Sequence, residues 1–452
     1  MRHECLPSIS SERLATLVKD LRARIEDVAF LRRHRRDEKS FTRRRRLPFG
    51  VVMILLLQKT VKSIQRHLHE YLAGLVDGPA RGPLTGGAWT QARAKFCHTA
   101  FIELNEQCVL PTLYDGEAGA IGRWKGHRVL GMDSSILRLP NAQEVGQRFG
   151  WVKNSNQSGA TGVSPEGRMS VVYDVLNRMG LDARLVSSKR GEIELAIEQL
   201  SVLKPGDLCL LDRGFTGFEM LARICHQGQD FVARCSTASF GPSQEMFAND
   251  VAGVSRTVTI RACRAQQQNM RELGIPMELV MRFVSVRLST GELEVLVTSL
   301  CDEEKYPTEC FAHLYHQRWG IETYYLMLKS RLDLENWTGQ TAEAVCQDFH
   351  ASVLLANLES LLTRSAQEVL TQRKTPQAHE QRVNRSVSYH ALKCRLFDLL
   401  LSDVPADQVV SELTQLFTAN AVSRRQERKI PRTKASLARS LYFQRHQRKN
   451  VY

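Results

Sequence analysis

The sequence predicts an α/β protein in which a strand-rich core lies between two helical regions. Apolar residues recur at helical spacing over roughly the first 110 residues, strand-like patterns begin near Gly122, and helical spacing returns over residues 341–420. The chain has 452 residues, of which 43% are hydrophobic, so it can form two or three domains with their own cores. We expect a helical domain at 1–118, a strand-rich core at 119–345 and a helical region with a basic tail at 346–452.

The N-terminal region contains three helical patterns. Residues 11–30 and 51–75 form the first two, and the Gly/Pro-rich stretch "VDGPARGPLTGG" ends the second. The third pattern covers residues 88–110, and we expect it to end before Pro111. Several short helices beside an arginine cluster are typical of a DNA-binding module, but a plain helical domain with an exposed basic loop fits the pattern too.

The middle of the chain begins with a strand, a hairpin, a helix and a further strand. "RVLGMDSSILRL" is a predicted strand that carries Asp133, and the residues around the turn at 177–180 form a predicted hairpin. "EIELAIEQLSVL" is a predicted amphipathic helix. The apolar run "LCLL" is a predicted buried strand that ends at Asp212. Two aspartates are therefore carried by two separate strands.

Residues 231–300 are again typical of strands. "FVARC", "RTVTIRAC" and "MELVMRFVSVRLSTGELEVLVTSL" are rich in β-branched residues, and the last alternates between apolar and polar positions. We expect a β-rich insertion at about residues 228–304.

The stretch "YHQRWGIETYYLMLK", residues 315–329, is predicted to be one helix. At about 100° per residue, its polar side chains lie within about 60° of one another, and an apolar flank can pack on a core. An ordinary solvated face with an Arg318–Glu322 ion pair fits this pattern too. The four polar residues that share the face are Tyr315, Arg318, Glu322 and Lys329.

Basic charge is concentrated at two places. Residues 31–46 hold nine Arg/Lys against two acids, a net of +7, and residues 422–452 hold ten against one, a net of +9. Since the whole chain carries +14, the rest is close to neutral. Basic runs are often only solvated tails, but two of them favour contact with a polyanion such as a nucleic acid.

Several classes of protein are excluded by the sequence. The longest apolar run, residues 51–57, is far shorter than the roughly 20 residues of a membrane span, and we expect no membrane contact and a cytoplasmic location. The 11 cysteines form no C-x-x-C pair and are expected to be reduced. The sequence contains neither a phosphate-binding G-x-x-x-x-G-K-S/T motif nor H-E-x-x-H.

Three acids are candidates for metal-dependent phosphoryl transfer. Mg²⁺ prefers carboxylate oxygens, and a few acids on adjacent elements can hold two ions that activate a nucleophile and stabilise the leaving oxygen. A single aspartate in a strand is usually structural, but Asp212 closes a buried apolar run, where an unpaired charge is costly. The candidates are Asp133, Asp212 and Glu322.

Two motifs carry a resemblance to a known family. Residues 315–329 match Y-x2-R-x3-E-x6-K without a gap, and "DRGF" matches D-x-G-[FY] at Asp212. Asp133 precedes Asp212 by 79 residues, and Glu322 follows it by 110. The chain resembles bacterial DDE transposases of insertion-sequence family four over most of its length.

The resemblance implies an RNase H-like catalytic core with a β-rich insertion between the second aspartate and the glutamate. It implies cut-and-paste transposition: hydrolysis at each transposon end, hairpin formation, hairpin opening, and attack of the 3′-hydroxyl on target DNA. Asp133, Asp212 and Glu322 would hold two Mg²⁺ ions, and we expect Mn²⁺ to substitute.

DNA contacts are implied in the same way. Tyr315, Arg318 and Lys329 would hold phosphates of the end DNA, and Trp319 would stack on a flipped base, although Trp319 can also simply pack the helix. The N-terminal helices and the arginines at 43–46 would bind the terminal inverted repeats. These arginines are Arg43, Arg44, Arg45 and Arg46. A homodimer in the synaptic complex and association with the nucleoid are expected by analogy.

One feature departs from the family pattern. Some members have a second tryptophan in the insertion, whereas residues 213–318 of this chain contain none. Four phenylalanines are candidate substitutes: Phe231, Phe240, Phe247 and Phe283. Two alternatives stay open: an RNase H-like nuclease without strand transfer, and a DNA-binding protein with an inactive core.

Overall fold

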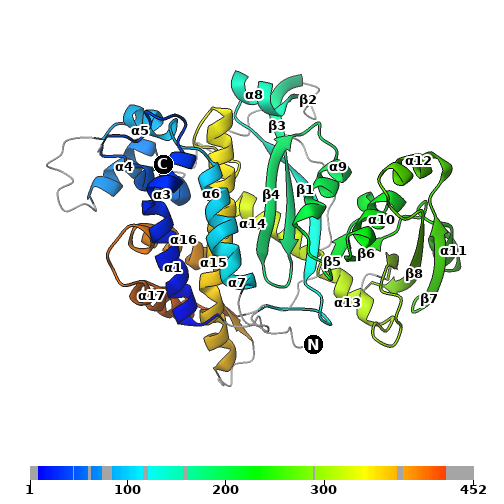
Figure 1. Ribbon diagram of the computed structural model, residues 1–452. Helices are drawn as coiled ribbons and strands as arrows, with labels where there is room; N and C mark the ends of the chain where they lie inside the picture. Colours follow the sequence, from blue (N-terminus) through cyan, green and yellow to red (C-terminus); the bar gives the residue numbers. More distant parts are fainter. Residues whose placement is uncertain are drawn as a thin grey trace. The chain divides into compact units, whose positions relative to one another are not determined.

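The computed structural model describes residues 9–43, 45–59, 63–73, 84–115, 121–155, 161–288, 291–373 and 380–423. The chain forms two compact units (Figure 1). The first unit comprises residues 1–121, 136–167 and 327–452, and the second comprises residues 122–135 and 168–326. Neither unit is a continuous stretch of chain. The domain limits expected from the sequence stay a prediction.

The first unit is mainly helical. Its core is α15 (Ala342–Gln372), a 31-residue helix that contacts α1, α3, α6, α16 and α17 and lies alongside α6 in Figure 1. Both predicted helical regions are confirmed. The other helices are α1 (Ser11–Glu26), α2 (Val28–Arg33), α3 (Phe49–Gln58), α4 (Ile64–Ala73), α5 (Gly86–Arg93), α6 (Thr99–Leu104), α7 (Leu110–Tyr114), α8 (Gln143–Phe149), α16 (Arg385–Leu400) and α17 (Ala406–Ala419). Three short strands are β2 (Trp151–Ser155), β10 (Gln381–Arg382) and β11 (Val422–Ser423).

The predicted end of the third helical pattern at Pro111 is wrong. The backbone stays helical through a π-helical turn, Asn105–Val109, and continues as α7 to Tyr114. In that turn the N–H of Leu110 donates to the carbonyl of Asn105, five residues back. Because proline has no N–H, this wider turn lets the helix pass a residue that cannot make the ordinary bond. The pattern is also interrupted between α5 and α6, so it forms several helices rather than one.

The strands form one mixed sheet in the order β2-β3-β1-β5-β6-β9-β8-β7, with β4 paired to β3. β1, β5 and β6 are parallel, whereas β9, β8 and β7 are antiparallel to their neighbours. Bonds from Val175 N to Val129 O and from Leu139 N to Pro165 O show that β3 and β1 are antiparallel. The predicted strands and hairpin are confirmed as β1 (Val129–Arg138), β3 (Thr161–Asp174), β4 (Met179–Ser187), β5 (Leu208–Leu211), β6 (Asp230–Arg234), β7 (Ser255–Arg261), β8 (Glu278–Arg287) and β9 (Leu293–Thr298).

The helices of the second unit were predicted only in part. α9 (Glu192–Gln199) is the expected amphipathic helix, and a single 3₁₀ turn, Leu200–Val202, follows it. Three further helices were not predicted: α10 (Phe218–His226), α11 (Gly241–Asn249) and α12 (Arg264–Glu272). Each has only nine residues, which is shorter than the roughly 11 to 18 residues over which a helical period is judged, and α12 buries only Met270.

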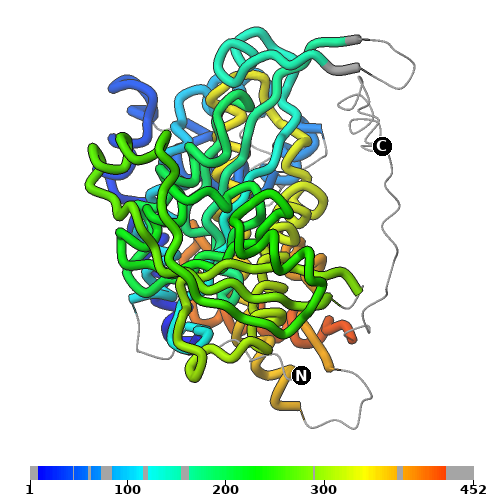
Figure 2. The backbone as a smooth tube through the Cα atoms, turned by 90° about the vertical axis from the view of Figure 1, so that its right-hand side faces the viewer, coloured from blue at the N-terminus to red at the C-terminus, as the bar shows by residue number. Residues whose placement is uncertain are grey.

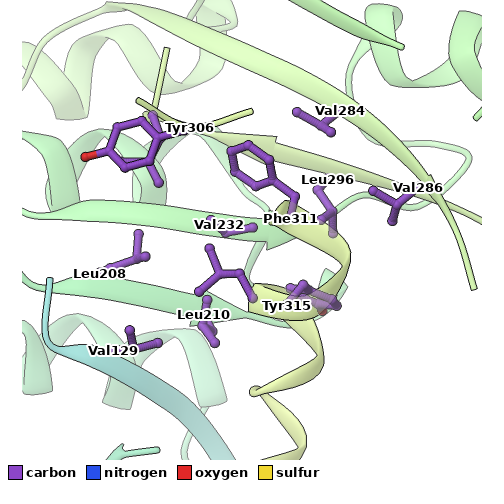
Figure 3. Packing of buried hydrophobic residues seen from close by; sticks show 12 residues of the cluster. Val129, Leu208, Leu210, Val232, Val284, Val286, Leu296, Tyr306, Phe311 and Tyr315 are labelled. Carbon is purple, nitrogen blue, oxygen red and sulfur yellow. The ribbon is translucent and has the colours of Figure 1, made fainter. Parts of the chain in front are cut away.

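The core of the second unit lies where α13 (Cys310–His316) packs on the sheet. Figure 3 shows Phe311 and Tyr315 of this helix among apolar side chains from β5, β6, β8 and β9. Figure 2 shows the same strands as green to yellow-green tubes that run side by side. Leu208 and Leu210 face this cluster, so the alternate residues of β5 point to the other face of the sheet.

The prediction of one helix over residues 315–329 is wrong. The segment is divided into α13 and α14 (Trp319–Ser330), with a tight turn at Gln317 and Arg318. The N–H of Arg318 donates to Tyr315 and the N–H of Gly320 donates to Gln317, three residues back in each case. The angles expected for one straight helix therefore apply only within each of the two helices.

Candidate active site

Asp133 and Asp212 are brought together by the register of two parallel strands. β1 and β5 pair Val129 with Leu208 and Gly131 with Leu210, always 79 residues apart. Continuing this register by two residues places Asp133 opposite Asp212, the pair that is also 79 residues apart. Adjacent strands are about 4.8 Å apart, and residues opposite each other point to the same side. The extended register therefore predicts that the two aspartates lie on the same side, just beyond the paired part of β1 and β5.

Asp133 is half-buried, and its surroundings disfavour the ionised form of its carboxyl group. Burial, with smaller contributions from the charges of Glu192 and Glu322, raises the pKa of this carboxyl to about 6. The N–H of Ser134, 2.8 Å from Oδ1, and the charge of Arg318 oppose the rise in pKa. A second cation beside Asp133 would therefore be strongly favoured.

Asp212 directly follows β5 and begins a 3₁₀ turn, Arg213–Phe215. Its Oδ1 is buried and accepts no hydrogen bond from any described residue. A buried carboxylate oxygen without a partner is costly, so this position favours a bound cation. The strand ends here as predicted.

Glu322 lies on the first turn of α14 and is paired with Arg318. Arg318 Nη2 is 2.8 Å from Glu322 Oε1, and the arginine side chain is almost fully buried. Burial lowers the pKa of Arg318, but Tyr315, Glu322 and Asp212 raise it, and the net shift is upward. Arg318 is therefore a fixed cation among these acids, and the ion pair considered from the sequence is present.

Tyr315 lies in the apolar core rather than on an open face. It is buried among the side chains of Figure 3, and its hydroxyl donates to the carbonyl of Leu211 at 3.2 Å. Leu211 is the residue before Asp212. The Arg318 guanidinium lies over the Tyr315 ring, 5.8 Å from its centroid. In this arrangement Tyr315 supports the strand that carries Asp212.

Trp319 and Lys329 lie in different surroundings. Trp319 is 38% exposed, and the Arg318 guanidinium lies 5.3 Å from its ring centroid. Lys329 belongs to the first unit, where its Nζ donates to the carbonyl of Ile136 at 2.7 Å and burial lowers its pKa. The structure brings Asp133, Asp212, Glu322, Tyr315, Arg318 and Trp319 into one unit, but not Lys329.

No group of three or more His, Cys, Asp or Glu with metal-binding geometry occurs among the residues that the structure describes. The ion pair with Arg318 occupies Glu322. Even so, Asp212 Oδ1 has no hydrogen-bond partner among the described residues, and the pKa of Asp133 is raised. Both carboxylates therefore suit a divalent cation better than a neutral partner.

Two ion pairs beside the aspartates were not found from the sequence. Arg168 Nη1 donates to Ser134 Oγ at 2.7 Å and pairs with Glu192, next to Asp133. Arg234 Nε is 2.9 Å from Glu294 Oε1, on the side of Asp212. A glutamate inside the apolar run "LEVLVT" was the only local signal for the second pair.

The predicted DNA-binding arginines precede α3. Arg43, Arg45 and Arg46 are exposed, whereas Arg44 lies outside the described residues. Most of the basic C-terminal segment, from residue 424 onward, also lies outside them.

Among the proposed substitutes for a tryptophan in the insertion, Phe231 and Phe283 are fully buried and cannot stack on a base. Phe240 and Phe247 are half-buried. Within the described chain, no helix combines the length and hydropathy needed to cross a bilayer.

Fold and site together define an α/β enzyme core with two aspartates on neighbouring strands and a glutamate on a following helix. Residues 124–358 match the family model described as "Transposase DDE domain", and the chain belongs to this family of transposases. The predicted class of enzyme, a polynucleotidyl transferase, is thereby confirmed, and so is the family that the motifs resemble.

Two curated relatives agree with this assignment. The chain is 21% identical over 331 residues to the transposase for insertion sequence element IS231F of Bacillus thuringiensis subsp. israelensis, over 64% of this chain and 67% of that protein. It is 22% identical over 240 residues to transposase InsG for insertion sequence element IS4 of Escherichia coli K12, over 52% of each. The chain thus spans only about half the length of the second relative.

A solved structure, a piggyBac transposase synaptic complex with hairpin DNA, aligns with 96% of this chain and 89% of its own at a TM-score of 0.44 and 9% identity. A similarity at this level supports no conclusion about fold or function.

Proposed function

We propose that this protein is a cut-and-paste DNA transposase that binds the terminal inverted repeats of its own insertion sequence, cleaves both ends and joins them to target DNA. The observation that carries this proposal is the register of β1 and β5, which sets Asp133 opposite Asp212 when it is continued by two residues. The sheet supports an RNase H-like core, because an antiparallel β4-β3-β1 set is followed by β5 and β6, both parallel to β1.

Asp133, Asp212 and Glu322 are the residues that would hold two Mg²⁺ ions, or Mn²⁺ in their place. Such ions activate the attacking oxygen and stabilise the leaving oxygen of a phosphodiester. The Asp212 oxygen without a partner and the raised pKa of Asp133 support this assignment.

The remaining residues orient these acids and the DNA. Arg318 neutralises Glu322 when the site is empty of DNA, and its forked donors suit a phosphate once Glu322 takes another partner. Tyr315 fixes the end of β5 through Leu211. Trp319 is exposed enough to stack on a base, and the hairpin step would depend on it because the insertion lacks tryptophan.

Lys329 can reach phosphate only if it leaves Ile136. Repeat binding is assigned to the exposed Arg43, Arg45 and Arg46, with Arg44, and pairing of two ends would require a homodimer.

The proposal is tested with a plasmid that carries the DNA flanking the gene of this protein, incubated with Mg²⁺ or with EDTA. We expect double-strand breaks at the flanks that require Mg²⁺. Glu322→Gln should keep DNA binding and reduce cleavage by more than about 100-fold, because even groups that only support a metal ligand are worth about 10- to 100-fold.

Glu219→Gln is the matched control. Glu219 pairs with Arg223 elsewhere in the second unit, also at i,i+4 spacing, and the two side chains are 2.7 Å apart, against 2.8 Å for Arg318 and Glu322. A loss of binding as large as the loss of cleavage would count against a metal role for Glu322. Binding without cleavage under every metal condition would indicate a DNA-binding protein with an inactive core. Cleavage without joining would indicate a nuclease.

A further inference from the structure

An ion pair with no role in the proposed function lies on the far side of Asp212 from Asp133. β5 and β6 are parallel and pair Leu210 with Val232 and Leu211 with Ala233. One further step of this register places Arg234 opposite Asp212. The extended register therefore sets Asp133 of β1, Asp212 after β5 and Arg234 at the end of β6 in one row.

The backbone of Arg234 is held from two sides. Its carbonyl accepts a bond of 2.6 Å from Thr216 Oγ1, in the turn that follows Asp212. On its other side Arg234 pairs with Leu296 of β9. The position of Arg234 relative to Asp212 is therefore fixed by the sheet and by this turn.

Glu294 orients the Arg234 side chain. Its Oε1 lies 2.9 Å from Arg234 Nε, and its side chain is 6% exposed, against 29% for Arg234. A buried carboxylate is costly unless it is paired, so the Glu294 charge needs the arginine. The arginine is the partner that reaches solvent.

The pair shares its electrostatic surroundings with the candidate site. Burial raises the pKa of the Glu294 carboxyl, Arg234 and Arg318 lower it, and Asp212 raises it. Burial also raises the pKa of Tyr315, which Asp212 and Glu294 raise further and Arg318 and Arg234 lower. Arg234 and Arg318 therefore both lower the pKa of Glu294 and of Tyr315.

Arg234 keeps donors that the protein does not use. A guanidinium has five N–H donors, and Nε faces Glu294. No hydrogen bond joins its two Nη groups to a described residue. A partly exposed guanidinium with two such nitrogens suits a bidentate contact with phosphate.

We propose that Arg234 binds a phosphate of the DNA strand that enters the candidate active site. Glu294 is a positioning residue that orients the Arg234 guanidinium. This inference rests on the proposed function and adds a cation that the Y-x2-R-x3-E-x6-K motif does not contain. The ligand class is a phosphodiester of the DNA backbone.

The test uses the full chain and duplexes tiled across the DNA that flanks its gene. Dissociation constants are measured over a series of salt concentrations, and single-turnover cleavage is measured at saturating protein with Mg²⁺. Arg234→Ala should lower the slope of log Kd against log salt by about 0.7 to 0.9, the value for one phosphate contact. It should slow cleavage by about 10- to 100-fold, the usual loss for a hydrogen bond to a charged group.

Two further variants separate positioning from stability. Arg234→Lys should restore the salt slope, because the charge remains, but not the cleavage rate, because the fork is lost. Glu294→Gln alone should slow cleavage. Added to Arg234→Ala in a double variant, it should not slow cleavage further, because the guanidinium that it positions is already absent. Arg256→Ala is the matched control, because it breaks an exposed pair with Glu245, at 2.6 Å, in the same unit.

The outcomes distinguish this inference from the proposed function. An unchanged salt slope in Arg234→Ala, with a lowered melting temperature, would mean that the pair only joins β6 to β9, and the inference would be overturned while transposase activity stands. If the wild-type chain binds these duplexes without cleaving them, the proposed activity fails, and the salt slope still decides for or against the phosphate contact. If the wild-type chain does not bind them, both are overturned.

Discussion

Asp133 is the acid whose chemistry is most changed by its surroundings. Burial and the charges of Glu192 and Glu322 outweigh the Ser134 N–H and Arg318, and the pKa of this carboxyl rises to about 6. An aspartate in an unfolded chain has a pKa near 3.9. The folded protein therefore holds a proton on Asp133 more tightly than the unfolded chain does.

This shift predicts how Asp133→Asn changes stability with pH. A raised pKa means that the folded state is relatively favoured below about pH 4 and loses that advantage as the pH rises to about 6. A shift of about two units corresponds to about 3 kcal/mol, less the screening by solvent at this half-buried site. Without metal, Asp133→Asn should therefore raise the melting temperature at pH 7 to 8, and the gain should vanish near pH 4.

Thermal unfolding in EDTA across this pH range measures the effect. Asp403→Asn, at an exposed position, serves as the control and should show no such dependence. Added Mg²⁺ should stabilise the wild-type protein more than Asp133→Asn. A melting curve for Asp133→Asn that runs parallel to wild type at all pH values would contradict the raised pKa.

At the scale of single elements, the turn between α13 and α14 determines the shape of the site. Because the helix breaks at Gln317 and Arg318, Tyr315 points into the core while Arg318 and Glu322 form their own pair. A single straight helix would have placed Tyr315 and Glu322 on one face. Arg318 contacts both of these residues, because its guanidinium also lies over the Tyr315 ring.

A buried arginine connects α5 to α15 in the first unit. Arg93 donates to Gln347 at 2.7 Å, to Ala344 O at 2.8 Å and to Asp348 at 2.8 Å, and also to Thr338. Both charged side chains are almost fully buried. Removing one partner of such a pair leaves an uncompensated charge in the interior.

We therefore expect Arg93→Met to lower the free energy of unfolding by about 3 to 5 kcal/mol. Denaturant unfolding measures this value. Arg66→Met, which breaks an exposed i,i+4 pair with Glu70, should cost less than about 0.5 kcal/mol. Equal costs for the two variants would show that burial does not determine the strength of the Arg93 interactions.

At the scale of the whole molecule, charge is distributed unevenly along the chain. Residues 31–46 and 422–452 carry +7 and +9, which together exceed the net +14 of the whole chain, so the rest is slightly acidic. The described part of the first cluster includes three exposed arginines just before α3. Such a patch gives affinity for DNA that depends on salt but carries no sequence information by itself.

Replacing the arginines at 43–46 with alanine should reduce the slope of log Kd against log salt by up to about 3 to 4 for duplex DNA, at about 0.9 for each phosphate contact. Filter binding over a salt series measures the slope. The matched control removes the same charge from the insertion, at Arg256, Arg261, Arg264 and Arg271, all of which are exposed. If both variants lower the slope equally, net charge rather than the cluster before α3 governs binding.

Much of the fold and the candidate acids followed from the sequence, because the signals are local. An apolar run such as "LCLL" can be satisfied only as a buried strand, and the aspartate at its end is visible without knowledge of the fold. Asp133 and Asp212 lie in and after strands that the sequence predicted, whereas Glu322 lies on α14, the second of two helices where the sequence predicted one. The nine-residue helices of the second unit were missed because each is shorter than the roughly 11 to 18 residues over which a helical period is judged.

Other features depended on contacts between distant residues. The register that sets Asp133 opposite Asp212, and Arg234 beside it, exists only when β1, β5 and β6 pair. The Arg234–Glu294 contact joins residues 60 positions apart. The sequence by itself therefore determined which residues can do the chemistry and on which elements they lie. The tertiary structure decided which of them meet, because strand pairing and burial are set by the whole chain and not by any one segment.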